Sequence, residues 1–156
     1  MRETKRKQKD ILKDMLSGDM QKIWSASCEI VSLSQNHEKI MELVPHTDEM
    51  YRAVKKLEPG GFIIPHQRVL EKVFQILQLH KEGKECPCRL LGGESNPKDL
   101  IEDGYFELVN MVYCDNKDYI DSYTVLCKHC HKIYQVEERE YHFTWWEWTE
   151  IGENSF

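Results

Sequence analysis

The stretch Cys127-Lys128-His129-Cys130, together with the earlier Cys86-Pro87-Cys88, decides how the C-terminal half of this chain is expected to fold. A zinc ion with four thiolate ligands holds their sulfur atoms about 3.8 Å apart, given Zn–S bonds of about 2.3 Å. A Cys-x-x-Cys turn reaches that separation because the chain folds back over two residues. Pro87 fixes its own φ and favours a bend, so Cys-Pro-Cys can also form a tight chelating turn. We therefore predict one structural Zn²⁺ site with four ligands: Cys86, Cys88, Cys127 and Cys130.

The cysteine pairs could instead form disulfides or lie in the core as plain thiols. Disulfides need an oxidising compartment, and nothing in the sequence marks the chain as secreted. Plain buried cysteines are common, but two close pairs in one hydrophilic region favour a metal. The sequence leaves open whether His129, His131 or Cys114 replaces one of the four ligands. Cys28 falls in a helical apolar pattern and is expected in the core.

The segment Cys127–Val136 resembles the knuckle of a zinc ribbon, in which Cys-x-x-Cys is followed by a short turn and a strand. It departs from that pattern at His131, where such knuckles usually carry Gly. The resemblance covers residues 84–151 and concerns the motif and the strand pattern. It implies a structural zinc ion.

Length and charge limit the function. The 156 residues, 40% of them hydrophobic, fit one domain or two small ones. A formal net charge of −6 argues against general nucleic-acid binding, although five basic residues crowd the N-terminus: Arg2, Lys5, Arg6, Lys7 and Lys9. No apolar run approaches the length of a membrane-spanning helix, and the charged start does not fit a signal peptide. We expect a cytoplasmic protein.

The first half of the chain has helical periodicity. Five helices are expected, at residues 5–17, 20–34, 36–44, 47–57 and 66–82. Asp19 and Asn36 are suited to cap helices, and Gly83 is expected to end the last one. Leu16-Ser17-Gly18-Asp19 followed by Gln21–Ala26 resembles a HEAT-type repeat, in which paired helices stack through small residues. Because at least three such repeats are usually needed, the strand region is expected to cover the helices.

The second half of the chain alternates as strands do. Strands are expected at residues 105–113, 119–126, 132–136 and 141–151, with turns at 115–118 and 137–140. Residues 85–91 are expected to be extended and 92–97 to form a loop. The predicted fold class is α+β: short antiparallel, HEAT-like helices (1–83) packed on a C-terminal antiparallel β-meander with a zinc-ribbon-like site (84–156), as one integrated fold.

The last predicted strand carries aromatic residues on both faces. Such a strand can be buried on both sides. The alternative is a partner-binding surface, because exposed tryptophans are favoured interface anchors, and the carboxylates beside them make it acidic. The residues proposed for this surface are Trp146, Trp148, Glu147 and Glu150.

One constellation resembles an enzyme. His80-Lys81-Glu82 followed by Cys127-x-x-Cys130 is similar to the zinc site of nucleoside deaminases, which implies His and two Cys on zinc and Glu as proton shuttle. The match departs from the family at Leu126, where the motif has Pro, and a four-cysteine set leaves no place for water.

The sequence therefore predicts a non-catalytic, zinc-stabilised module that binds another protein. An immunity-type protein that neutralises a basic toxin or effector domain is the example we favour, because opposite charge speeds association. The alternatives are a zinc-dependent, nucleic-acid-associated factor that uses the basic N-terminus, and a deaminase-like zinc hydrolase.

Overall fold

The computed structural model describes residues 7–57, 64–93, 95–113, 120–140 and 144–153. The chain is an α+β protein, as predicted, with helices in its first half and a four-stranded antiparallel sheet at its C-terminal end. It divides into two compact units, Met1–Pro87 and Cys88–Phe156. Each unit has buried apolar residues of its own.

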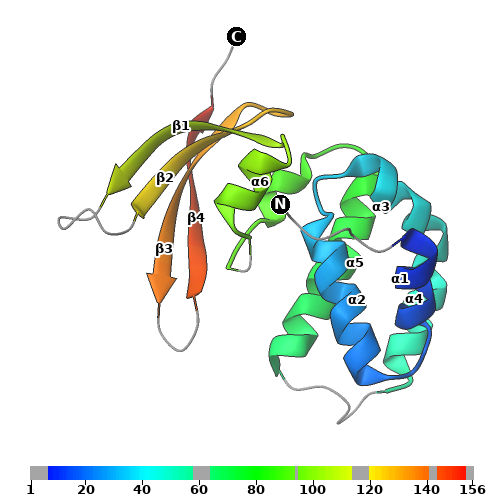
Figure 1. Cartoon of the computed structure of the whole chain (residues 1–156). Coiled ribbons are helices and arrows are strands. Elements are labelled where there is room, and N and C mark those ends of the chain that lie inside the picture. Colours follow the sequence, from blue (N-terminus) through cyan, green and yellow to red (C-terminus); the bar gives the residue numbers. More distant parts are fainter. Residues whose placement is uncertain (1–6, 58–63, 94, 114–119, 141–143, 154–156) are drawn as a thin grey trace. The chain divides into compact units, whose positions relative to one another are not determined.

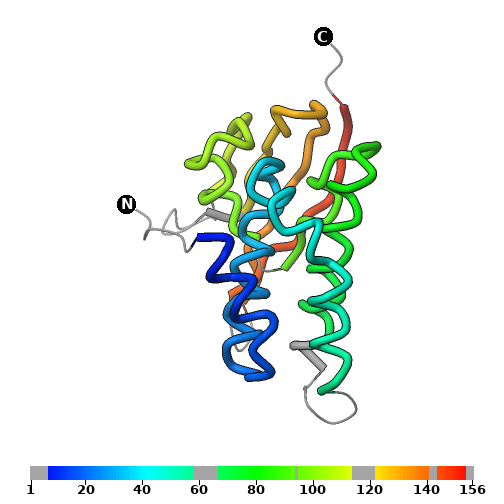
Figure 2. Tube along the Cα trace, turned by 90° about the vertical axis from the view of Figure 1, so that its right-hand side faces the viewer, coloured from blue at the N-terminus to red at the C-terminus, as the bar shows by residue number. Residues whose placement is uncertain are grey.

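The first unit is a set of short helices (Figure 1). They are α1 (Gln8–Met15), α2 (Met20–Ser32), α3 (His37–Leu43), the 3-10 turn η1 (Val44–His46), α4 (Thr47–Lys55) and α5 (Ile64–Glu82). Helix α5 contacts α2, α3 and α4, and α1 contacts α2, α3 and α4, so the helices lie side by side (Figure 2). Their apolar faces supply the core of this unit through buried residues such as Ile11, Ile23, Ile40, Met50 and Val73.

The helix boundaries follow the predicted signals. The Asp19 carboxylate accepts hydrogen bonds from the N–H groups of Gln21 and Lys22, at 2.9 and 3.2 Å. The Asn36 side chain accepts from the N–H of Lys39 at 3.1 Å. Gly83 has φ +66° and ends α5, as the αL position after a helix requires. These caps satisfy backbone groups that the helix itself leaves unpaired.

Small residues form the contact between α1 and α2. Ala26 and Ser27 are fully buried, and the Ser27 hydroxyl lies 3.6 Å from the sulfur of Met15. The expectation that Cys28 is a core residue is wrong, because its side chain is exposed. One position beyond Ser27, the helix has turned Cys28 out of the buried stripe.

A buried histidine links α5 to the end of α2. His80 is 4% exposed, and its Nε2 lies 2.7 Å from the carbonyl oxygen of Ser34. Because a carbonyl only accepts, Nε2 carries the hydrogen. The other nitrogen, Nδ1, lies 2.8 Å from Nδ1 of His37, and the two rings stack. Both ring nitrogens of His80 therefore have partners within this unit.

The second unit is a β-meander preceded by two short helices. The 3-10 helix η2 (Pro87–Leu90) leads into it and α6 (Pro97–Glu102) follows. Strands β1 (Phe106–Tyr113), β2 (Ile120–Cys127), β3 (Lys132–Glu140) and β4 (Thr144–Glu153) pair in the order β1-β2-β3-β4, all antiparallel (Figure 1).

One face of the sheet carries an aromatic cluster formed by Phe106, Tyr134 and Trp148. Their ring centroids lie 5.5 to 6.2 Å apart with edge-on geometry. The segment before β1 lies against this cluster and strand β4, because the Trp148 indole donates to the Ser95 carbonyl at 2.9 Å. The backbone N–H of Trp146 donates to the Gly93 carbonyl at 3.0 Å.

Two local predictions around this unit are wrong, and one helix was not predicted. Residues 85–91 are not extended, because η2 begins at Pro87. The predicted loop 92–97 is confirmed in its described residues up to Asn96. It leads into α6, a helix that was not predicted, which starts where Asn96 caps the helix and Pro97 takes its first position. The predicted polar turn at 137–140 is the end of β3.

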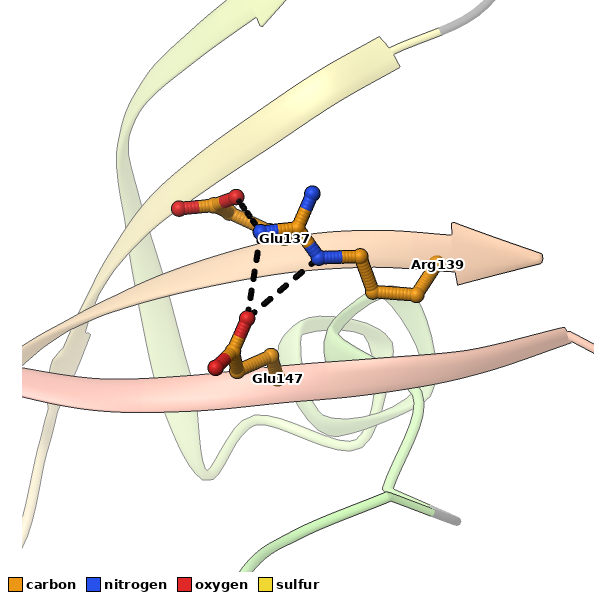
Figure 3. A network of polar contacts seen from close by, with 3 residues as sticks. All are labelled: Glu137, Arg139 and Glu147. Atoms are coloured by element: carbon orange, nitrogen blue, oxygen red, sulfur yellow. Dashed lines mark hydrogen bonds and ion pairs between the residues drawn. The ribbon is translucent and has the colours of Figure 1, made fainter. Parts of the chain in front are cut away.

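That polar segment is a strand in which residues 137–140 each pair with a residue of β4, and charged side chains also pair across the two strands. The Arg139 guanidinium pairs with the carboxylate of Glu137 on its own strand and with that of Glu147 on β4, the latter at 3.1 Å (Figure 3). Glu137 and Glu147 lie directly opposite each other in the β3–β4 register, and like charges in such positions repel. Arg139 offsets that repulsion.

Two further predictions fall outside the described residues: the turn at 115–118 and the first residues of the last strand, 141–143. In the part of the chain that the structure describes, no helix is long and apolar enough to cross a membrane.

The His80 contacts generate a stability prediction. Replacing His80 with Phe keeps a ring of similar size but leaves the Ser34 carbonyl without its donor, so the free energy of unfolding should fall by about 1–3 kcal/mol. His46→Phe is the control, since its imidazole pairs with the Glu49 carboxylate in a partly exposed position, and it should change stability by less than about 0.5 kcal/mol. Urea unfolding followed by circular dichroism measures both. Equal losses in the two variants would contradict the assignment.

Candidate metal centre

Two segments bring the four predicted cysteines together. Cys86 lies just before η2 and Cys88 within it, while Cys127 ends β2 and Cys130 lies in the turn before β3. The last described pair before that turn is Leu126 with Ile133, and the His131 N–H closes the turn by donating to the Cys127 carbonyl at 2.8 Å. The antiparallel pairing of β2 and β3 therefore sets the position of the second cysteine pair.

The four sulfur atoms have the spacing of a metal site. All four lie within 4.8 Å of one another, and Cys88 Sγ lies 3.4 Å from Cys130 Sγ. The separation expected around one tetrahedral ion, about 3.8 Å, lies between these values. Cys88 and Cys127 are each 1% exposed. The cluster can hold a metal ion.

The alternative ligands are not part of this cluster. His129 and His131 are both exposed and do not belong to it, and Cys114 lies outside the described residues. None of the five described cysteines forms a disulfide. Among the described residues, the four cysteines are the one group of three or more His, Cys, Asp or Glu side chains with metal-binding geometry.

His131 has a left-handed backbone conformation, with φ +66°. The zinc-ribbon resemblance placed Gly at this position, and a left-handed backbone is the conformation that favours Gly. Among non-glycine residues, His is one of those that tolerate this region comparatively well. The departure noted in the sequence therefore leaves the turn intact.

Two residues of β3, Tyr134 and Lys132, lie near the sulfur atoms. The Tyr134 hydroxyl lies 3.1 Å from Cys88 Sγ, and burial, followed by this contact, raises the pKa of Tyr134 above its ordinary value. The hydroxyl therefore keeps its proton. Lys132 pairs with Glu150 at 3.2 Å, and the hydrogen bond to that carboxylate raises the pKa of Lys132. A cation is thus kept beside a site whose four thiolates would carry negative charge.

The sequence did not single out Tyr134. The one indication of its role in the sequence was its position in the strand that follows Cys130. Residues 132 and 134 share a face because strand side chains alternate.

The residues proposed for partner binding do not share one face. Trp146, Trp148 and Glu150 follow the alternation of one side of β4, and Glu147 lies on the other. Trp148 is committed to the aromatic cluster, and its indole N–H is bonded to Ser95. Glu147 and Glu150 are exposed and pair with Arg139 and Lys132. The exposed part of the proposed surface consists of carboxylates.

No protein-family model, curated protein or solved structure shows a significant match to this chain. The zinc-ribbon and HEAT resemblances therefore rest on the quoted residues alone.

The His131 backbone generates a prediction with an internal control. His131→Gly and His131→Ala both remove the imidazole, so their difference isolates the backbone. Because an L-residue with a Cβ is strained in this region, the Gly variant should be more stable than the Ala variant by about 1–2 kcal/mol. Thermal unfolding of both variants in the same buffer measures the difference. An Ala variant as stable as the Gly variant would rule out a left-handed residue 131.

Proposed function

We propose that this chain is a non-catalytic, zinc-stabilised module that binds another protein. The observation that carries the proposal is the convergence of Cys86, Cys88, Cys127 and Cys130 within 4.8 Å. Thiolates are soft ligands, and a tetrahedral set of four is typical of zinc or of iron–sulfur centres. Zinc is the choice we make, because Cys-x-x-Cys knuckles of this shape usually hold it.

A structural role follows from the number of ligands. Catalytic zinc sites keep three protein ligands and an open position for water or substrate, whereas four cysteines close the coordination sphere. The free energy of metal binding then contributes to folding, since the site does not exist in the unfolded chain. This site ties the η2 segment to the β2–β3 turn.

Metal content and melting test the site directly. Purified, reduced protein should contain one zinc ion per chain by elemental analysis, and a strong chelator should lower its melting temperature. Cys127→Ser should lose most of the bound metal, because three ligands bind zinc more weakly. Cys28→Ser is the matched control, since Cys28 lies outside the cluster, and it should keep wild-type zinc content. Metal-free protein that melts at the same temperature with and without chelator would overturn the proposal.

Charge supports the choice of a basic protein partner. The chain carries a formal net charge of −6, and strand β4 presents three exposed carboxylates, those of Glu147, Glu150 and Glu153. Opposite charges steer two proteins together and raise the association rate more than the affinity. Neutralisation of a basic toxin or effector domain, as by an immunity protein, is one function of this type.

A charge-matched comparison tests the partner surface. Glu147→Gln with Glu150→Gln removes two charges from β4, and Glu38→Gln with Glu42→Gln removes two exposed charges from the first unit. Wild type and the Glu38/Glu42 variant should capture the same protein from a lysate of the native host. That protein, once purified, should associate with the β4 variant about tenfold more slowly at low salt.

Equal association rates for all three forms of the purified chain would show that β4 is not the binding surface. Recovery of nucleic acid alone, with binding that weakens steeply as salt rises, would favour the nucleic-acid alternative. Of the five basic residues on which that alternative depends, only Lys7 and Lys9 lie among the described residues.

The deaminase-like alternative gains nothing from the described residues. The metal-binding group consists of four cysteines, and both nitrogens of His80 are engaged by Ser34 and His37.

A further inference from the structure

We propose that Tyr134 is a positioning residue for the metal centre, its hydroxyl donating a hydrogen bond to the sulfur of Cys88 and thereby slowing metal release. This inference rests on the proposed zinc site and names a side chain beyond the four ligands that controls it.

In the zinc-bound site, the chemistry of the sulfur gives the direction of this hydrogen bond. The Tyr134 oxygen lies 3.1 Å from Cys88 Sγ, and a metal-bound thiolate has no hydrogen to give, so the phenol is the donor. A hydroxyl buried among apolar groups destabilises the fold unless it has a partner. Tyr134 is 5% exposed, and the sulfur supplies that partner. A phenylalanine would fill the same space without this requirement.

The aromatic cluster holds the donor in place. The rings of Phe106 and Trp148 pack edge-on against Tyr134, with centroids 6.2 and 5.7 Å from its own. The indole of Trp148 is itself fixed by its bond to the Ser95 carbonyl. The phenol is therefore aimed at Cys88 by the core of its own unit.

A hydrogen bond to a thiolate ligand changes the bond to the metal. Removal of such partners of metal ligands typically weakens metal binding about tenfold to a hundredfold. The donor withdraws electron density from the sulfur, which makes it less reactive towards protons and oxidants and raises the energy of sulfur-to-metal charge transfer. Both effects disappear when the hydroxyl is removed.

Tyr134→Phe tests the proposal, with Tyr123→Phe as the matched control. Tyr123 lies on the adjacent strand, is 3% exposed and bonds through its hydroxyl to Lys98 rather than to a cysteine. Tyr134→Phe should still bind one zinc ion but release it to a chelator about tenfold faster or more. In the cobalt-substituted protein, its sulfur-to-metal charge-transfer band should move to longer wavelength. Tyr123→Phe should leave the release rate and the band unchanged.

The outcomes separate this inference from the proposed function. A wild-type protein without zinc overturns the site itself. Zinc in both forms, with equal release rates and identical cobalt spectra, overturns the role of Tyr134 and leaves the site standing. Faster zinc release in both Phe variants would show general destabilisation, and this result would also overturn the proposed role of Tyr134. If Tyr134→Phe does not fold, 3-fluorotyrosine in place of Tyr134 provides the test: as a stronger donor it should move the band to shorter wavelength, and an unchanged band contradicts the proposal.

Discussion

The convergence of four thiols is the constraint on which the second half of this protein depends. Two of them lie beside or within a single turn of 3-10 helix, and two lie at the ends of the β2–β3 turn. Four buried or half-buried thiols without an ion would be a weak set of hydrogen bonds, whereas around one ion they become a cross-link between residues distant in the sequence.

The sheet is organised around the same point. Tyr134 contacts a cysteine at one end and two aromatic rings at the other, so the polar site and the apolar core of this unit are continuous. Strand alternation accounts for this arrangement, because residue 134 shares its face with Trp148 and Val125 across the register. A change at the metal centre should therefore be felt in the packing of the sheet.

Much of the fold could be predicted from local signals. Asp19, Asn36 and Gly83 act at helix ends through their own side chains or backbone freedom, which requires no knowledge of distant residues. The four cysteines were recognisable because metal ligands come in closely spaced pairs. The prediction failed where a distant residue decides the conformation. The segment 137–140 has the composition of a turn, and its strand conformation comes from backbone pairing with residues 144–147 of β4, which the composition of the segment does not reveal.

The burial of the residues proposed for partner binding also depends on residues that are distant in the sequence. Two tryptophans on one strand indicate either a core or an interface. The bond from Trp148 to the Ser95 carbonyl, far away in the sequence, assigns this half-buried side chain to the aromatic cluster. Tyr134 was missed for the same reason, since the residue that it contacts, Cys88, lies 46 positions earlier in the sequence.

The arrangement around Arg139 also constrains how this hairpin can diverge. One guanidinium serves two carboxylates that face each other across β3 and β4 (Figure 3). Loss of the arginine alone would leave an uncompensated like-charge pair, while loss of both glutamates would leave a cation without a partner. Positions 137, 139 and 147 are therefore expected to covary in evolution. Neutral or charge-swapped replacements at these positions should become fixed together rather than singly.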